Sequence, residues 1–227
     1  MCGRYVLKAA IDELKKKYGA VPDGVFEFSP NYNAAPSHQL PVVIGHNEGR
    51  KISVMRWGLV PFWAESPKTG YSMINARAET LHKKRSFSKP LESQRCIVPA
   101  NGFYEWKKND SGKVPHYITT PDGNLMNFAG LYEIWHGKDG EIIPSFTIIT
   151  TGANKKIMEL HDRMPAMLLP EEFDIWLNPH EQNTGHLRDL LRPWPDDGIQ
   201  YYRVETTVNN VRNSGAELIE PYRDLFG

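Results

Sequence analysis

Short runs of apolar residues, many of them β-branched or aromatic, recur along this chain between polar stretches. The runs that predict strands lie at residues 40–44, 51–57, 117–120, 125–132 and 145–151. Glycine-containing breaks of the kind found in hairpin turns lie at 47–49, 121–123 and 138–140. Short strands joined by tight turns indicate a sheet that is mainly antiparallel.

Helical periodicity is confined to a few segments. The segments that predict helices are 8–18, 153–160 and 171–177. In the first, Ile11, Leu14 and Tyr18 share one helical face. Pro170 opens the third as a first-turn proline followed by acidic residues.

The number of short strands relative to helices predicts the fold class. We expect an α+β fold built on an irregular, mainly antiparallel β-sheet or barrel with a few flanking helices. No internal repeat, low-complexity tract or long Gly/Ser linker divides the chain. We therefore expect a single domain over residues 1–227.

Composition and charge exclude several classes of protein. Lys plus Arg and Asp plus Glu number 27 each, so the formal net charge is zero and no overall electric field attracts the protein to nucleic acid or membrane. A polyanion would therefore have to bind in a local positively charged groove. No apolar run approaches the length of a membrane span, and no signal peptide opens the sequence. Two cysteines, Cys2 and Cys96, cannot form a disulfide framework, and no Cys/His spacing resembles a zinc site. We expect no metal or other cofactor, and a cytoplasmic location.

The cysteine at position 2 carries unusual chemistry. The initiator methionine is generally removed when the next side chain is small, and removal here would leave the α-amine and the thiol of Cys2 on adjacent carbons. The pKa of an α-amine lies below that of a lysine, so part of it is neutral at physiological pH. A neutral amine condenses with an aldehyde to a Schiff base, and the thiol can then close a thiazolidine ring. The alternative is that Cys2 belongs to a frayed terminus, as most chain ends do.

Two clusters combine polar groups with apolar or aromatic neighbours. The alternation INARAE at 74–79 places Asn75 and Arg77 on the wet face of a strand, which any half-exposed strand would also show. The run GFYEW sets Glu105 between aromatic residues, a setting that suits a carboxyl group for general acid–base work. A strand glutamate with aromatic cross-strand neighbours explains that pattern as well.

Two further clusters are histidine-containing and basic. His161 and Asp162 follow a predicted helix, where a histidine can interact with the helix end; the further ligands that a metal hydrolase needs are missing. The stretch 83–95 holds several Lys and Arg residues with Glu92 as its one acid, which is typical of a solvated face. With other arginines and the tryptophans of WGLVPFW at 57–63, it could also line a site for a single nucleic-acid strand.

Together these motifs resemble one family closely. They are CGRY at 2–5, YNAAP at 32–36, WGLVP at 57–61, INARAE at 74–79, GFYEW at 102–106, HDRMP at 161–165, VNN at 208–210 and GAELI at 215–219. The chain resembles the SOS-response-associated-peptidase (SRAP) family of abasic-site processing proteins over nearly its whole length. The order and combination of the motifs make chance agreement implausible.

The resemblance implies a reaction that fits the chemistry of Cys2. Family members bind single-stranded DNA with an abasic site, whose opened sugar exposes an aldehyde at C1′. The processed Cys2 would form a thiazolidine with it, and this DNA–protein crosslink shields the lesion from strand cleavage. Asn75 would orient the amine or the opened sugar, Glu105 would relay protons, and His161 would assist ring opening and contact the adjacent phosphate.

The resemblance also implies residues that bind the strand. Arg4, Asn33, Arg77 and Arg85 match positions that hold its backbone, whereas Pro36 and Trp63 match positions that wedge against the duplex side or stack on a base. The peptidase in the family name is taken here as autoproteolytic release of the initiator methionine. The implied partner is single-stranded DNA with abasic sites rather than a membrane, and we expect a monomer that joins the nucleoid when bound to DNA.

One position departs from the family pattern. Relatives commonly carry a second aromatic residue directly after the tryptophan, whereas this chain has Ala64 and then a longer loop at 65–71. Either Trp63 or Tyr71 takes over the stacking, or the preference for a DNA junction is weaker. A retained Met1 would block the amine and prevent the thiazolidine.

Two other classes of function fit the same residues. An N-terminal-nucleophile thiol peptidase or amidohydrolase would use the Cys2 thiolate with Glu105 or His161 as the base, and it would turn over an amide. A non-catalytic single-strand binder would bind intact DNA equally well, and alkylation of Cys2 would change nothing.

Overall fold

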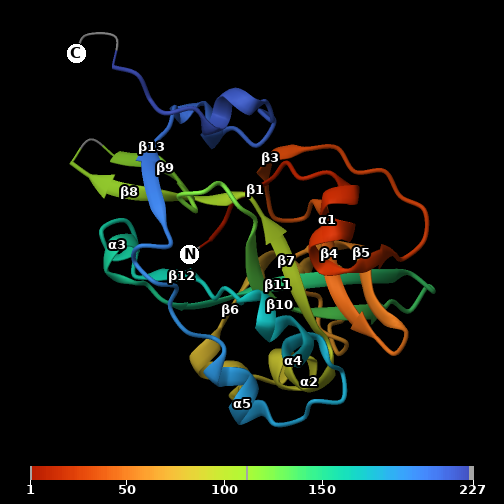
Figure 1. Cartoon of the computed structure of the whole chain (residues 1–227). Coiled ribbons are helices and arrows are strands. Elements are labelled where there is room, and N and C mark those ends of the chain that lie inside the picture. Colours follow the sequence, from red (N-terminus) through yellow and green to blue (C-terminus); the bar gives the residue numbers. More distant parts are fainter. Residues whose placement is uncertain (1, 111, 225–227) are drawn as a thin grey trace.

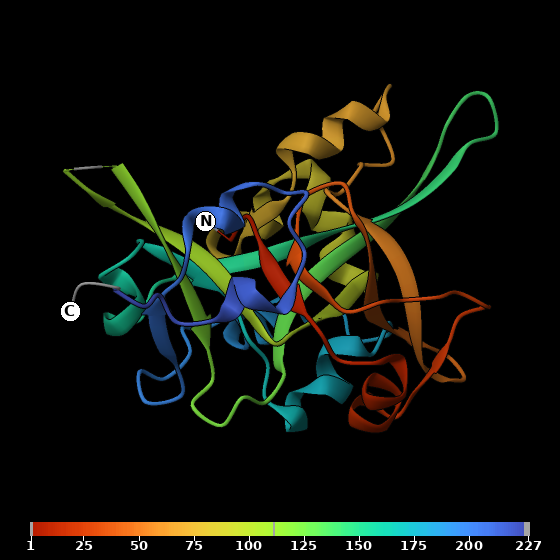
Figure 2. The same ribbon diagram turned by 90° about the horizontal axis from the view of Figure 1, so that it is seen from above.

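The computed structural model describes residues 2–110 and 112–224, and its strands form two sheets (Figures 1 and 2). The strands are β1 (Tyr5–Leu7), β2 (Ala20–Pro22), β3 (Asn31–Ala34), β4 (Gln39–His46), β5 (Gly49–Trp57), β6 (Asn75–Arg77), β7 (Arg95–Ala100), β8 (Gly102–Asn109), β9 (Gly112–Thr119), β10 (Met126–His136), β11 (Ile142–Gly152), β12 (Arg163–Pro165) and β13 (Gln200–Arg203). The helices are α1 (Ile11–Tyr18), α2 (Arg85–Ser93), α3 (Lys155–Met158), α4 (Phe173–Leu177) and α5 (Thr184–Asp189). Short 3-10 turns are η1 (Pro67–Ser72), η2 (Ala78–Lys83), η3 (Pro170–Glu172), η4 (Thr206–Asn209) and η5 (Ala216–Ile219).

The larger sheet curls into a partly closed barrel. Its order is β12-β11-β10-β7-β4-β5-β2, and β11 also pairs with β5. These two strands run parallel where Ser145 lies opposite Arg56 and Phe146 opposite Trp57. Closure protects sheet edges that would otherwise expose unpaired backbone groups. The rings of Trp57 and Phe146 stack inside it with centroids 6.4 Å apart, and both are fully buried.

The smaller sheet contains the first strand of the chain in its interior. Its order is β13-β9-β8-β1-β3, and Tyr5 of β1 lies opposite Phe103 on one side and Ala34 on the other. Asn101 joins the two sheets between β7 and β8, and its backbone N–H donates to the Val6 carbonyl oxygen at 2.7 Å. Two mainly antiparallel sheets with a few helices confirm the predicted α+β fold.

The predicted helices are present but shorter than expected. Helix α1 begins at Ile11, and Leu14 and Tyr18 on its inner face are buried, as the periodicity predicted. It ends where Gly19 takes a left-handed conformation with φ 56°. Pro170 stands at the start of η3, which leads directly into α4.

The break at 121–123 is a turn but not a hairpin, and this corrects the prediction. Strand β9 before it belongs to the smaller sheet and β10 after it to the larger, so the turn carries the chain from one sheet to the other. The breaks at 47–49 and 138–140 do join antiparallel neighbours, β4 with β5 and β10 with β11. Turn residues predict a reversal, but tertiary packing decides which strands then pair.

The basic stretch at 83–95 is not a solvated face throughout, which corrects a second prediction. Much of it forms α2, whose apolar side packs into the core. Arg95 is buried, and its guanidinium donates to the carbonyl oxygens of Leu91, Trp176 and Asn178. These carbonyls lie at the ends of α2 and α4, where helices leave acceptors unpaired. Burial lowers the pKa of Arg95 to about 10, so the group stays charged and caps both helices.

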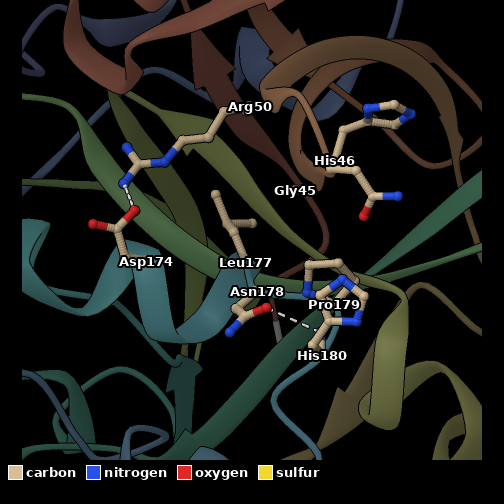
Figure 3. A pocket seen from close by; sticks show the side chains of 10 residues that line it. Gly45, His46, Arg50, Asp174, Leu177, Asn178, Pro179 and His180 are labelled. Carbon is tan, nitrogen blue, oxygen red and sulfur yellow. Dashed lines mark hydrogen bonds and ion pairs between the residues drawn. The ribbon is translucent and has the colours of Figure 1, made fainter.

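Helix α4 ends against β4 at a contact that requires glycine (Figure 3). A Cβ atom on Gly45 would overlap the Leu177 carbonyl oxygen and lie 2.8 Å from the carbonyl carbon. Beside this contact, Arg50 of β5 forms an ion pair with Asp174 of α4 at 2.6 Å. The helix is thus fastened to the β4–β5 hairpin by close packing and by one charged pair.

We expect Gly45→Ala to lower the free energy of unfolding by about 1 to 3 kcal/mol, because the α4 backbone must move to admit the methyl group. Gly152→Ala is the matched control, since a Cβ atom there would meet nothing within 4 Å. Urea denaturation of both variants measures the difference. Equal stability of the two variants would contradict the close approach of α4 to β4.

Candidate active site

The segment before β1 is buried. Cys2 is 1% exposed, and its carbonyl oxygen accepts a hydrogen bond from the Asn75 side-chain nitrogen at 2.8 Å. Its thiol makes a weak hydrogen bond to the Arg4 carbonyl oxygen at 3.8 Å. The alternative that Cys2 belongs to a frayed end is therefore wrong. Met1, whose removal we expect, lies outside the described residues.

Strand β6 brings Asn75 to Cys2. It pairs in parallel with β11, with Asn75 opposite Ile148, so the predicted strand at 74–79 is present in its middle part. The side-chain nitrogen of Asn75 binds the Cys2 carbonyl, whereas its Oδ1 is buried without a hydrogen-bond partner among the described residues. An unsatisfied buried acceptor costs about 1 to 3 kcal/mol. This oxygen is a candidate acceptor for a group that enters beside Cys2.

Glu105 of β8 acts on the Cys2 thiol through its charge. Glu105 is buried, and its Oε1 accepts a hydrogen bond from the Trp106 backbone N–H at 3.3 Å. Burial raises the pKa of the Cys2 thiol far above its ordinary value, and the negative charge of Glu105 raises it further. The thiol is therefore protonated at neutral pH, and its use as a nucleophile requires a base.

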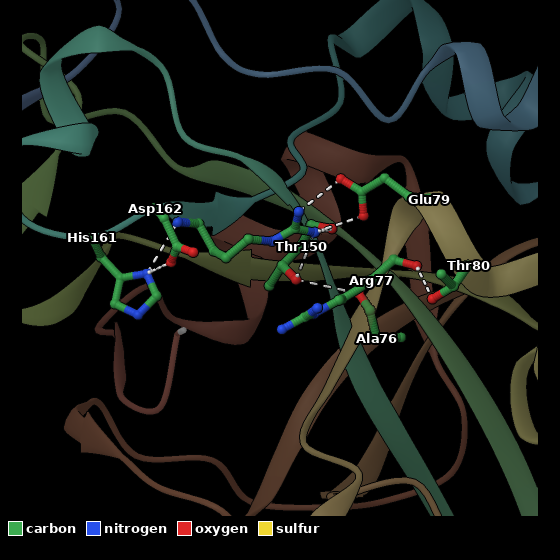
Figure 4. A network of polar contacts seen from close by, with 8 residues as sticks. Ala76, Arg77, Glu79, Thr80, Thr150, His161 and Asp162 are labelled. Atoms are coloured by element: carbon green, nitrogen blue, oxygen red, sulfur yellow. Dashed lines mark hydrogen bonds and ion pairs between the residues drawn. The ribbon is translucent and has the colours of Figure 1, made fainter.

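His161 lies in the loop between α3 and β12, and its Nδ1 has two competing neighbours (Figure 4). The Asp162 carboxylate is 2.8 Å away, and the backbone N–H of Arg163 donates to the same nitrogen at 3.0 Å. A protonated Nδ1 can donate to the carboxylate, and an unprotonated one can accept from the amide, but it cannot do both. The protonation of His161 thus decides which neighbour its Nδ1 binds.

The segment that follows His161 is braced against η2, the turn that directly follows Arg77, and against β11 (Figure 4). Arg163 binds both carboxylate oxygens of Glu79, at 2.7 and 2.9 Å, and the Thr150 carbonyl oxygen at 2.6 Å. The hydrogen bonds from Arg163 hold the pKa of Glu79 below its usual value. Arg77 itself is exposed, and within residues 2–110 and 112–224 its guanidinium forms no hydrogen bond or ion pair.

A cavity of about 670 Å³ gathers part of the predicted site. It is lined by Gly3, Arg4, Glu105, Trp106, Lys108, Lys113, His161 and Asn209. Three predicted residues meet here, namely Arg4, Glu105 and His161, and Gly3 connects the lining to Cys2. Sequence reasoning missed the two lysines of the β8–β9 hairpin, Lys108 and Lys113, and Asn209 of the carboxy-terminal segment. The signal for the hairpin was a pair of lysine-containing runs on either side of a short polar turn.

Arg4 and Asn33 hold the carboxy-terminal segment onto the amino-terminal one. Arg4 Nη1 donates to Asn33 Oδ1 at 2.7 Å and to the Val208 carbonyl oxygen at 3.1 Å. Asn33 is 1% exposed, and its Nδ2 donates to the carbonyl oxygens of Val208, Asn210 and Asn213. The structure thus gives Asn33 a bracing role, and its predicted contact with a strand remains a prediction that its burial does not support.

Trp63 and Arg85 meet on the surface beside α2. The guanidinium of Arg85 lies 5.4 Å from the Trp63 ring and 5.9 Å from the Phe62 ring. Lys89 Nζ lies 4.8 Å from the Phe62 ring, and both aromatic side chains are exposed. Exposed aromatics beside cations are typical of single-strand binding sites. Pro36 is half-buried in the loop between β3 and β4.

Ala64, where the family resemblance implies an aromatic residue, faces the interior. It packs with Val60 and Trp135, and its carbonyl oxygen accepts the Trp135 indole N–H at 2.8 Å. Tyr71 in the longer loop is 61% exposed, with the Arg56 guanidinium 4.9 Å from its ring. The loop therefore presents an exposed aromatic at Tyr71 in place of one at Ala64.

The described part of the chain holds no group of three or more His, Cys, Asp or Glu side chains that could bind a metal. Across the same residues, no helix has both the length and the apolar character needed to cross a membrane. The groups available for chemistry at the site are a thiol, a carboxylate, an imidazole and an amide.

In this chain a cysteine at position 2 is buried beside a partly closed barrel, and an asparagine holds it by its carbonyl oxygen. The family model described as SOS response associated peptidase (SRAP) matches residues 1–211. The chain belongs to the SRAP family, as its motifs predicted.

Relatives and solved structures agree with this assignment. The chain is 43% identical to "Abasic site processing protein YoqW" of Bacillus subtilis (strain 168), over 98% of this chain and 100% of that protein. It is 33% identical to "Abasic site processing protein HMCES" of Xenopus tropicalis, over 96% of this chain and 77% of that protein. A crystal structure of a protein from Bacteroides thetaiotaomicron superposes with a TM-score of 0.88 at 28% identity, over 98% of this chain and 100% of that chain.

We expect Glu105→Gln to speed alkylation of Cys2 at a given pH. Removing the negative charge lowers the pKa of the thiol, so the thiolate fraction rises and iodoacetamide reacts several-fold faster. Cys96 is an internal control, because burial alone raises the pKa of its thiol. Peptide mass spectrometry quantifies both sites. An unchanged Cys2 rate would contradict the coupling between Glu105 and the thiol.

Proposed function

We propose that this chain processes abasic sites in single-stranded DNA by forming a covalent crosslink to them through Cys2. The observation that carries the proposal is the setting of Cys2, which is bound by Asn75 and coupled in charge to Glu105. Membership of the SRAP family and the names of its relatives support the choice of substrate. We further propose a cytoplasmic monomer that acts once on each lesion.

The proposed reaction has three steps and requires a free α-amine. Hydrolysis of the bond between Met1 and Cys2, as an autoproteolytic step, supplies that amine. The amine adds to the C1′ aldehyde of the opened sugar, and loss of water gives an imine. The thiol sulfur then adds to the imine carbon while its proton passes to the ring nitrogen. One water leaves for each thiazolidine formed, and no oxidant or reductant is needed.

Glu105 and His161 divide the proton transfers in this proposal. The thiol is protonated at neutral pH, so Glu105 takes its proton as the sulfur adds and returns it to the nitrogen. Opening of the sugar requires a proton on the ring oxygen, and His161 on the cavity wall supplies it, with Asp162 stabilising the charged imidazole. The unpaired Oδ1 of Asn75 accepts a hydrogen from the amine or from the opened sugar.

Strand binding rests on exposed cations and aromatics in this proposal. Arg77 and Arg85 bind phosphates, and Trp63 stacks on a base. Pro36 wedges against the duplex side. Arg4 contributes to strand binding from the cavity wall, and it also holds the carboxy-terminal segment in place. Asn33 contributes to strand binding indirectly, because it accepts a hydrogen bond from Arg4 and holds the same segment.

We expect intact-mass spectrometry after mixing with abasic single-stranded DNA to show one adduct per protein, with the mass of protein plus strand minus one water. Cys2→Ser and Cys2→Ala retain a free amine, so each should form a Schiff base that borohydride traps, but no stable thiazolidine. An uncleavable residue placed before Cys2 should abolish both adducts, because an amide nitrogen is not nucleophilic.

If the chain were a thiol peptidase, the Cys2 variants and the variant with a blocked amine would rank differently in activity. It would lose activity in Cys2→Ser, keep activity when the amine is blocked, and turn over an amide repeatedly. A stable crosslink with the amine blocked would rule out the thiazolidine route. Equal binding of intact and abasic strands without any adduct would favour a non-catalytic binder.

We expect Arg77→Ala to weaken binding of intact and abasic strands alike, by about three- to tenfold, because a phosphate contact carries no information about the lesion. Lys16→Ala on α1 is a control, since this exposed lysine lies outside the proposed site. Fluorescence anisotropy with both strands measures the effect. A loss confined to abasic DNA would contradict the assignment of Arg77 to the backbone.

A further inference from the structure

Two lysines face each other across the β8–β9 hairpin. The antiparallel register places Lys108 of β8 directly opposite Lys113 of β9. Side chains paired in this way lie about 4.5 to 5.5 Å apart at Cβ, and like charges there destabilise the pair. Both residues are exposed, so neither contributes to the core. A repulsive pair without a packing role indicates a function outside the stability of the hairpin.

No carboxylate in the described part of the chain neutralises this pair. Neither lysine side chain forms an ion pair or a hydrogen bond with a residue of 2–110 or 112–224. The cavity that both line also holds Arg4, and its single carboxylate is the buried Glu105. The wall formed by the hairpin is therefore cationic, although the chain as a whole has a net charge of zero.

The lysine pair lies on the wall of the cavity that contains the proposed proton-transfer groups. Side chains alternate along β8, so Trp106 and Lys108 share one face while Lys107 points to the other. The Trp106 indole N–H donates to Asn209 Oδ1 at 2.7 Å, which fixes the wall next to Lys108. Glu105 and His161 line the same space of about 670 Å³. An anion held by the lysines would thus lie near the reacting sugar.

We propose that Lys108 and Lys113 form a phosphate subsite, which binds the DNA backbone next to the nucleotide that reacts with Cys2. A lysine ammonium is a flexible point charge that suits a phosphodiester and reads no base. The inference rests on the proposed function for the identity of the strand. It needs no covalent step, so its test can be separated from the crosslinking reaction.

The first experiment measures binding without chemistry. A single strand with a tetrahydrofuran abasic analogue has no aldehyde and cannot crosslink. We expect Lys108→Gln/Lys113→Gln to reduce the slope of log K against log salt by about 1.4, because each phosphate contact on a single strand contributes about 0.7. At about 0.1 M salt the affinity should fall on the order of tenfold.

Lys107→Gln is the matched control, since Lys107 is exposed on the same strand and lies opposite Val114 but is not among the residues that line the cavity. It should leave the slope unchanged. An unchanged slope in the double variant, or an equal change in Lys107→Gln, would overturn the subsite.

A charge reversal separates binding from folding. Lys113→Glu replaces the repulsive pair with an attractive one, so the melting temperature should rise while affinity for the strand falls. Loss of both stability and affinity would mean that the lysines act through the fold, which would overturn the proposal. Unchanged affinity would overturn it as well.

Neutral methylphosphonate linkages, placed singly along the strand, then locate the bound phosphates. The parent protein should lose affinity at one or two linkages beside the abasic analogue, and the double glutamine variant should not respond to them. Equal sensitivity of both proteins would overturn the subsite. If the lysine variants weaken binding but the parent protein forms no crosslink with true abasic DNA, the proposed function fails and the phosphate subsite stands. If the parent protein forms crosslinks but the lysine variants bind like the parent, the proposed function stands and the phosphate subsite fails.

Discussion

The burial of the first strand is the constraint on which the rest of the structure depends. Chain termini usually fray, but β1 lies between β8 and β3, and its three residues are fully buried. Cys2 is therefore held at a fixed place, where Asn75 binds its carbonyl oxygen. A terminal nucleophile needs such positioning, because a free end would spread its amine over many orientations. The pairing that stabilises the smaller sheet also positions the proposed nucleophile, Cys2.

The neighbourhood of Cys2 combines features that an ordinary core avoids. The buried carboxylate of Glu105 disfavours the thiolate of Cys2, the Oδ1 of Asn75 is unsatisfied, and two groups compete for Nδ1 of His161. Each feature carries a cost in an apolar setting. Their concentration around one cavity and one terminus is the reason that we treat this region as the candidate site. The folded chain tolerates them because the partly closed barrel beside them buries a large apolar core.

Sequence patterns predicted those strands that contain a long apolar run bounded by turn residues. Strands β4, β5, β10 and β11 contain long apolar runs, and turn residues separate them. Strands β1 and β3 are only three and four residues long, too short for periodicity to detect, and the change of sheet at 121–123 depends on tertiary packing. Motifs indicated most of the candidate site. The bracing role of Asn33 was hidden, because its partners are carbonyl groups about 175 to 180 positions away.

The cavity takes its walls from segments that are distant in the sequence. Gly3 and Arg4 come from the amino terminus, Glu105 and the lysine pair from the β8–β9 hairpin, and Asn209 from a segment that Arg4 and Asn33 fasten down. The site is therefore complete only when both ends of the chain have folded together. Lys108 and Lys113 lie closer to the hairpin turn than the buried Glu105, so in our proposals the lysines act on affinity for the strand and Glu105 acts on the thiol. The hairpin can then retain a repulsive charge pair, since the core that holds Cys2 does not depend on it.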